Sequence, residues 1–428
     1  MKAAPDDGAV RVPGDKSVTH RALFLGALAT GRSRVRGALV SLDTRSTAEC
    51  LRNLGIDVPD LDRREFAVPG GGLRGFREPR VRLDCGNSGT TARLLLGALA
   101  GCPFASVVTG DASLRSRPMR RVTAPLAAAG AKFAEMGEPD RLPVGVYGGM
   151  LRTIEHDSPR ASAQVKSALL LAAVTGGTSA RVTEPTRSRD HTERMLAAMG
   201  AWVRIDGDSP VVVRIDRVDR LEPLDITVPG DFSSAAFLIA RAILAGPTVR
   251  IADVGINPTR TGMLDVVRRM GARIDIDDAR MEGGEPVADL SAGPARLLAT
   301  HIGPADVVRA LDEVPVLAIM AARAEGETRI TGAAELRVKE SDRLAALAAN
   351  LRAIGAHAEE TRDGLVIEGT DTPLRGRVET RGDHRIAMAF GVLAGLPGND
   401  IEIEDPAIAD VSFPGFWAMV GPGAAGGP

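Results

Sequence analysis

Polar and charged residues that precede apolar stretches are the parts of this sequence best suited to chemistry. In PGDKSVTHR, Lys16, Ser17 and Arg21 come just before the apolar run ALFLGALA. Positive side chains at the start of a helix oppose its dipole, which favours negative charge there. A bound anion offsets them, because free helix N–H groups together with Lys and Arg form a phosphate or carboxylate site. The segment therefore predicts a piece of an anion pocket.

Similar entrances recur along the chain, each with a Gly or Asp turn, a polar cluster and an apolar helical run. Their markers lie about 70 to 80 residues apart, at Asp15, Asn87, Ser162, Asp231, Asp312 and Asp383. Between them, glycines stand where a helix ends before a β-like stretch, at Gly55, Gly130, Gly200, Gly271 and Gly355. The pattern predicts an α/β fold of six β-α-β-α-β-β repeats.

A repeat scaffold whose polar clusters only cap helices is the alternative, since Ser, Asp and Asn favour N-caps without any function. A cap needs one such residue. These entrances also hold Lys16, Arg21, Gln164, Lys166, His384 and Arg385. For Asp231 and Ser233, capping and a binding role stay equally open.

Two further clusters are rich in positive charge. In RVKESDRL, Lys339 and Arg343 are four residues apart on one expected helix, which is unfavourable unless an anion lies between them. A solvated face neutralised by Glu340 and Asp342 is the alternative. In ASLRSRPMRR, four arginines surround Pro118, which we expect at the first position of a helix. This loop favours an acidic ligand.

Two loops next to expected helix starts carry charged residues with open roles. Arg187 and Arg189 precede a helix that we expect to be capped near Asp190, and capping and ligand contact are equally compatible with them. Asp312 and Glu313 precede the apolar run VPVLAIM. Partial desolvation there raises a carboxyl pKa towards that of a working base, although either residue also suits an N-cap.

Composition excludes several classes of protein. The 428 residues carry a net charge of −2, with 44% hydrophobic and 25% charged residues, so no basic field indicates nucleic acid or an anionic membrane. Three cysteines and six scattered histidines show neither disulfide nor metal spacing, which favours a reducing cytoplasm and no metal. No apolar stretch has transmembrane length. GGGLRG lacks a following helix and GDKS lacks the earlier P-loop glycine, so neither nucleotide motif holds.

Taken in order, the clusters resemble the 5-enolpyruvylshikimate-3-phosphate (EPSP) synthase family, from residue 11 to about residue 417. LRVKESDRL and GDHRIAM are specific signatures, and SAQVKS is closer to the class II bacterial branch than to the enteric and plant branch. The resemblance implies two domains of three repeats, residues 1–13 with 230–428 and residues 14–229, and an active site in the interdomain cleft. It also implies a cytoplasmic monomer without cofactor.

The resemblance implies transfer of the enolpyruvyl group of phosphoenolpyruvate to the 5-hydroxyl of shikimate 3-phosphate, by addition and elimination. This is the shikimate-pathway step that leads to chorismate and the aromatic amino acids, and the target of glyphosate. The implied catalytic residues are Lys16, Asp312, Glu340 and His384. The implied contacts of shikimate 3-phosphate are Lys16, Ser17, Arg21, Ser162, Ala163, Gln164, Arg189, Asp312 and Lys339. Those of phosphoenolpyruvate are Lys16, Asn87, Gly89, Arg117, Gln164, Arg343 and Arg385.

Some positions depart from the enteric branch of the family. Val411 stands in place of a lysine, Ala163 in place of a serine and Leu94 in place of a proline. Gly89, the small residue whose change to alanine gives tolerance in relatives, predicts sensitivity to glyphosate. The rival interpretations are the sister enolpyruvyltransferase that acts on UDP-N-acetylglucosamine and a non-catalytic repeat scaffold that binds anions.

Overall fold

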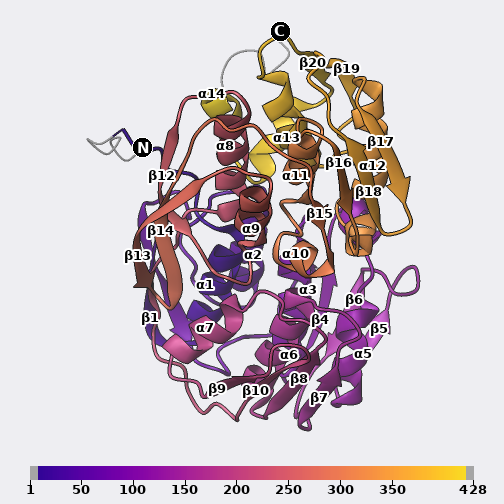
Figure 1. Cartoon of the computed structure of the whole chain (residues 1–428). Coiled ribbons are helices and arrows are strands. Elements are labelled where there is room, and N and C mark those ends of the chain that lie inside the picture. The colour runs from indigo at the N-terminus through magenta and orange to yellow at the C-terminus, as the bar shows by residue number, and fades with distance from the viewer. Residues whose placement is uncertain (1–7, 421–428) are drawn as a thin grey trace. The chain divides into compact units, whose positions relative to one another are not determined.

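The computed structural model describes residues 8–420, which divide into two units (Figure 1). Unit 1 comprises residues 8–13, Gly230–Arg280 and residues 286–420. Unit 2 comprises Gly14–Pro229 with Met281–Glu285. Residues 1–7 and 421–428 of the predicted first domain lie outside the described residues.

Unit 2 contains three small sheets, two of which share one topology. In two of them a parallel pair is followed by an antiparallel hairpin, which gives the orders β3-β4-β6-β5 and β7-β8-β10-β9. The remaining sheet, β11-β1-β2, takes its parallel strand β11 from the end of the unit. The strands are β1 (Thr30–Arg36), β2 (Glu65–Gly71), β3 (Leu83–Asp84), β4 (Ala105–Thr109), β5 (Lys132–Glu135), β6 (Val144–Tyr147), β7 (Ile154–Asp157), β8 (Ala180–Glu184), β9 (Val203–Asp206), β10 (Val211–Ile215) and β11 (Asp225–Thr227).

The helices of unit 2 follow the expected alternation with its strands. They are α1 (Lys16–Leu28), α2 (Leu42–Asn53), α3 (Gly89–Ala100), α4 (Ala112–Arg115), α5 (Arg120–Ala128), α6 (Ala163–Gly176) and α7 (His191–Ala198). Three of them, α1, α3 and α6, are the predicted apolar runs. In α6 every residue from position 165 to 175 is buried, as expected for a helix that is apolar on all sides.

Unit 1 repeats the topology with variations. One sheet has the order β15-β16-β18-β17, again a parallel pair and a hairpin. The sheet β12-β14-β13 borrows a parallel bridge from Val10 to Ile251, and the last repeat has only the parallel pair β19-β20. The strands are β12 (Val249–Gly255), β13 (Ile274–Glu282), β14 (Glu285–Ala292), β15 (His301–Ile302), β16 (Glu327–Ile330), β17 (His357–Thr361), β18 (Gly364–Glu368), β19 (Arg375–Val378) and β20 (Asp400–Ile403).

The remaining predicted apolar runs are helices of unit 1. They are α8, α11 and α13, and α13 packs against both of the others. The helices are α8 (Phe232–Leu244), α9 (Gly262–Arg269), α10 (Pro304–Arg309), α11 (Val314–Ala321), α12 (Arg343–Ala353), α13 (His384–Ala394) and α14 (Phe416–Val420), with short 3-10 helices η1 (Ala334–Val338) and η2 (Pro406–Val411). The sixth repeat thus departs from the predicted grouping, because the chain continues after β20 with η2 and α14 instead of a helix and hairpin.

Glycine shapes two recurring features of the fold. All five glycines predicted to end helices have positive φ, for example Gly55 at 87° and Gly355 at 92°, which confirms that prediction. Where α3 packs against α6, a Cβ on Gly97 would lie only 2.2 Å from the carbonyl oxygen of Ala168. A side chain at this position would push the two helices apart.

No helix among residues 8–420 is both long and apolar enough to cross a membrane.

Candidate active site

The first predicted cluster surrounds the start of α1. Asp15 caps the helix, with Oδ1 accepting the N–H of Val18 at 2.9 Å, and Lys16 and Ser17 form its first turn. Lys16 Nζ lies 3.0 Å from Asp43 Oδ2, and the two side chains are only 17% and 11% exposed. Asp43 lies on α2 and has no local sequence signal, so sequence analysis missed it.

Arg21, one turn further along α1, is almost fully buried. Its Nε donates to Thr192 Oγ1 at 2.7 Å and its Nη2 to Ser167 Oγ at 2.8 Å, which joins α1 to α7 and α6. The pKa of Arg21 is lowered to about 10, chiefly by burial, with a contribution from nearby Arg189, while Glu193 opposes the shift. The predicted residues Arg21 and Arg189 therefore lie close together. Their contact with a substrate phosphate stays a prediction.

The second cluster gathers at the start of α3. The residue that caps α3 is Ser88, next to Asn87, which marked this repeat in the sequence. The amide oxygen of Asn87 instead accepts a hydrogen bond from Arg117 Nη2 at 2.6 Å. A Cβ on Gly89 would lie 2.8 Å from Arg93 Nη1 and 3.3 Å from Arg117 Nη1. The absence of a side chain at position 89 therefore lets two guanidinium groups approach the helix start.

Arg93 and Gln164 connect this cluster to α6. Arg93 Nη1 donates to Gln164 Oε1 at 2.7 Å, and Gln164 Nε2 donates to Thr90 Oγ1 at 3.0 Å. Sequence analysis missed Arg93, although an arginine inside the apolar run TTARLLL is itself a signal of a buried polar contact. The structure thus brings Asn87, Gly89, Arg117 and Gln164 together, and their contact with phosphoenolpyruvate stays a prediction.

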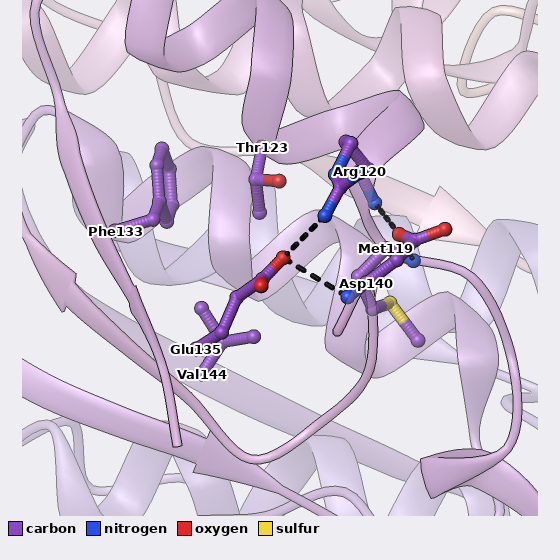
Figure 2. A pocket seen from close by; sticks show the side chains of 7 residues that line it. All are labelled: Met119, Arg120, Thr123, Phe133, Glu135, Asp140 and Val144. Atoms are coloured by element: carbon purple, nitrogen blue, oxygen red, sulfur yellow. Dashed lines mark hydrogen bonds and ion pairs between the residues drawn. The ribbon is translucent and has the colours of Figure 1, made fainter. Parts of the chain in front are cut away.

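The arginines of the basic loop differ in their surroundings, and Arg117 joins this cluster. Arg117 is buried, whereas Arg115 and Arg120 are exposed. Arg120 donates to Glu135 Oε1 at 3.0 Å in the wall of a separate cavity of about 280 Å³ (Figure 2). The structure thus places Arg117 and Arg120 of the loop in different surroundings, and an acidic ligand for the loop stays a prediction.

The helix that follows the loop also begins differently from the prediction. α5 starts at Arg120, two residues after Pro118, and Met119 at its N-cap makes no capping hydrogen bond. Asp140, which lies about twenty residues further along the chain, caps the helix instead, because its Oδ1 accepts the N–H groups of Met119 and Arg120 (Figure 2). Pro118 therefore precedes the helix instead of opening it.

The third cluster of unit 2 lies at the start of α6. Ser162 caps the helix and Ala163 is its first residue. The backbone N–H of Ser162 donates to the buried carboxylate of Glu184, at 2.8 Å from Oε1. Lys166, one turn further, is fully buried between Glu184 and Glu193.

In unit 1 the predicted acidic and basic residues gather around Arg343. This side chain is 1% exposed. Its Nε donates to Asp383 Oδ2 at 2.8 Å, its Nη2 donates to Glu340 Oε2 at 2.6 Å, and its Nη1 lies 3.5 Å from Asp312 Oδ1. Burial opposes the charged guanidinium, but the three carboxylates together raise its pKa above the ordinary value. Arg343 therefore holds Asp312 and Glu340 on one side chain.

Two more predicted residues adjoin this cluster. Arg385 Nη2 lies 3.7 Å from Asp312 Oδ2, and its Nη1 donates to the Asp312 carbonyl at 3.2 Å. Lys339 follows η1 and Arg343 begins α12, so the prediction that both lie on one helix is wrong. Burial lowers the pKa of the Lys339 ammonium, which Asp312 and Glu340 partly oppose.

Asp383 is the residue of this cluster that sequence analysis left without a role beyond marking a repeat. It caps α13 through the N–H of Arg385 at 3.0 Å and stands next to the predicted His384, which is buried. Burial alone raises the pKa of Asp383, but Arg343 outweighs it and His384 adds to the effect, so the net shift is downward.

Within residues 8–420 no group of three or more His, Cys, Asp or Glu side chains is arranged to hold a metal ion.

Comparison with known proteins decides the family. The model of the family "EPSP synthase (3-phosphoshikimate 1-carboxyvinyltransferase)" matches residues 2–420. The chain belongs to the EPSP synthase family. The 3-phosphoshikimate 1-carboxyvinyltransferase of Desulforamulus reducens is 48% identical over 96% of this chain and 95% of its own, and that of Gloeobacter violaceus is 50% identical over the same shares.

Solved structures agree with this assignment. EPSP synthase from Acinetobacter baumannii matches with a TM-score of 0.83 at 41% identity, over 96% of this chain and 94% of that one. The enolpyruvyl transferase NikO from Streptomyces tendae matches with a TM-score of 0.73 at 18% identity, over 97% and 94%, and shows a likeness of fold alone. The predicted α/β enolpyruvyltransferase-like fold class is confirmed, and so is the predicted membership of the EPSP synthase family.

Proposed function

We propose that this chain transfers the enolpyruvyl group of phosphoenolpyruvate to the 5-hydroxyl of shikimate 3-phosphate and releases phosphate. Full-length membership of a family of 3-phosphoshikimate 1-carboxyvinyltransferases supports the reaction. The structural observation that carries it is the pair of carboxylates, Asp312 and Glu340, held by one buried arginine, Arg343. Such a pair suits a reaction that both removes and delivers protons.

The clusters of unit 2 suit the anionic groups of both substrates. For shikimate 3-phosphate, we assign the starts of α1 and α6 with Arg189 as binding elements. For phosphoenolpyruvate, we assign the start of α3, where Gly89 leaves room for the guanidinium of Arg117, joined by Gln164. A guanidinium gives two donors in a fixed geometry that matches a phosphate or carboxylate.

The addition step forms one C–O bond. Asp312 accepts the proton of the 5-hydroxyl as its oxygen attacks C2 of phosphoenolpyruvate, and Glu340 delivers a proton to C3. The product is a tetrahedral ketal that carries both the phosphate and the shikimate oxygen. Lys16, Arg343 and Arg385 stabilise its negative charge, which preorganised cations do best where water is excluded.

The elimination step restores the double bond. A proton leaves C3, the C2–O bond to phosphate breaks, and phosphate departs with the proton that the 5-hydroxyl gave up. We assign to Glu340 the removal of the C3 proton and to Lys16 the transfer of the proton held by Asp312 to the departing phosphate, with His384 as the neighbour that supports these transfers. Lys339 holds the shikimate hydroxyl groups. Residues of this chain supply every proton transfer, so the proposal includes no cofactor and no metal.

We further propose that the two units correspond to the two domains predicted from the sequence, residues 1–13 with 230–428 and residues 14–229. The chain acts as a cytoplasmic monomer in this proposal.

Phosphate release tests the proposed function. The purified chain is given phosphoenolpyruvate alone, shikimate 3-phosphate alone, both together, or phosphoenolpyruvate with UDP-N-acetylglucosamine. We expect release only with both proposed substrates. Release with UDP-N-acetylglucosamine instead would assign the chain to the sister reaction, and tight anion binding without release would support a non-catalytic scaffold.

A further inference from the structure

Glu184, at the end of β8, contacts two separate turns that carry predicted substrate residues. Its Oε1 accepts the backbone N–H of Ser162 at 2.8 Å, at the start of α6. Its Oε2 accepts the backbone N–H of Ser188 at 3.3 Å, and both oxygens lie 2.8 Å from the Ser188 hydroxyl. Ser188 directly precedes Arg189, so one carboxylate joins the α6 start to the loop before α7.

The Glu184 carboxylate forms a buried ion pair with Lys166. Lys166 Nζ lies 2.8 Å from Glu184 Oε2 and 2.9 Å from Glu193 Oε1, and all three side chains are about 1% exposed. Lys166 Nζ also donates to the Ser188 carbonyl at 3.4 Å. Burial opposes the charge of Lys166, but the two glutamates outweigh it and raise its pKa. The ammonium therefore stays charged and binds the same loop as Glu184.

A buried ion pair of this kind is weak evidence of stabilisation, because desolvation offsets most of its Coulombic attraction. Its contacts point to a different role. Without Glu184 the N–H of Ser162 and the N–H of Ser188 would lose a common acceptor, and the two turns could move independently. A shift of about 1 Å in a positioning element is enough to weaken the binding of a substrate group strongly.

We propose that the Glu184–Lys166 pair is a positioning device that fixes the α6 start and the Arg189 loop at the spacing needed for the phosphate of shikimate 3-phosphate. The inference rests on the proposed function and assigns neither residue a contact with substrate. It predicts a defect that is larger for shikimate 3-phosphate, because both turns that the pair joins are assigned to that substrate. Only Gln164, in the first turn of α6, is shared with the phosphoenolpyruvate cluster.

Steady-state kinetics and direct binding on the full chain test the proposal. For Glu184→Gln we expect KM and Kd for shikimate 3-phosphate to rise at least about tenfold. KM for phosphoenolpyruvate should rise less than KM for shikimate 3-phosphate, because only Gln164 of the α6 start belongs to the phosphoenolpyruvate cluster. An unchanged Kd for shikimate 3-phosphate in a folded variant would overturn the proposal.

A double variant separates positioning from charge balance. Lys166→Met in the Glu184→Gln background removes the buried ammonium that the single change leaves with fewer partners. If the pair positions the turns, Kd stays high in the double variant, whatever its thermal stability, which also depends on Glu193 because that carboxylate loses the same cation. If Kd returns to the wild-type value, Glu184 only neutralises Lys166 and the proposal is wrong.

A matched control lies in unit 1. Asp289 on β14 also joins a backbone N–H, that of Asp253 at 3.0 Å, to a cation, Arg250 at 2.8 Å. Asp289→Asn should lower stability without changing either KM, and an equal rise in KM for shikimate 3-phosphate there would show that the effect is not specific. The proposed function would be refuted if the wild-type chain neither bound shikimate 3-phosphate nor released phosphate. Only the positioning role would be refuted if the wild-type chain were active and the variants were unaffected.

Discussion

Replacing Arg343 with methionine should destabilise unit 1 strongly. The change removes a 1% exposed guanidinium and leaves the carboxylate of Asp383, which is fully buried, without its bidentate partner. Asp312 and Glu340 lose a contact too, but their side chains are 20% and 23% exposed, so water solvates them in part. Most of the cost therefore comes from Asp383.

The expected loss of stability in Arg343→Met follows from the unpaired charge of Asp383. Removing one partner of a buried ion pair costs about 3–5 kcal/mol. Each kcal/mol lowers Tm by about 2–4 °C in a unit of this size, so we expect a fall on the order of 10 °C. Arg337→Met is the matched control: Arg337 pairs with Asp342 at 2.9 Å and Glu360 at 2.7 Å but is 26% exposed. Its loss should cost no more than about 1 kcal/mol for its ion pairs.

The stability lost in Arg343→Met should depend on pH, and the pKa of Asp383 determines in which direction. In the wild-type chain the pKa of Asp383 lies below 3.8, so its stabilising contribution is present above that pH and is lost on further acidification. Without Arg343, burial and Glu340 raise the pKa of Asp383 instead. The variant then regains stability as the pH falls towards 3.8, and its Tm deficit should shrink between pH 8 and pH 5.

Thermal unfolding followed by circular dichroism at several pH values measures both effects. Asp383→Asn in the Arg343→Met background removes the stranded charge and should restore part of the lost stability at pH 8. A deficit that stays constant with pH, or one no larger than that of Arg337→Met, would refute the electrostatic account of this cluster.

Three further changes test other parts of the structure. Gly97→Ala should cost about 1–3 kcal/mol of stability, because the new Cβ meets the backbone of Ala168 at 2.2 Å, and a melting curve measures it. Gly89→Ala should raise KM for phosphoenolpyruvate several-fold and weaken inhibition by glyphosate, since its Cβ displaces Arg93; unchanged inhibition would contradict this. Lys16→Met should lower kcat at least about 100-fold with normal folding, as expected for a group that moves a proton, and a near-normal rate would exclude that role.

Local features of the fold were predictable from the sequence. Helix starts at Asp15, Ser162 and Asp231 and helix ends at Gly55 and Gly355 depend on neighbours a few residues away, so short patterns report them. The six apolar runs also stand out, because helices buried on all sides have no polar face. The predicted α/β repeats follow from these two signals.

Contacts between distant segments were not predictable in the same way. Lys16 meets Asp43, Arg93 meets Gln164, and Glu184 meets Ser162, each across more than twenty residues. Which side chains meet depends on how the repeats pack, and a single sequence carries no direct record of that packing.

Sequence analysis also went wrong where the backbone departs from regular helix. Lys339 and Arg343 have helical spacing, but η1 ends at Val338 and α12 begins only at Arg343. Pro118 suits a helix start, but Asp140, from a distant loop, fixes the start two residues later. At Pro118 a tertiary contact outweighs the local preference.

The central claim is that this chain joins two substrates rather than hydrolysing one, and product analysis tests it most directly. The full chain is incubated with phosphoenolpyruvate and shikimate 3-phosphate, and the mixture is followed by phosphorus NMR and mass spectrometry. We predict that phosphate and an acceptor heavier by one enolpyruvyl group appear in equal amounts. Phosphate accompanied by pyruvate, with shikimate 3-phosphate unchanged, would contradict the account.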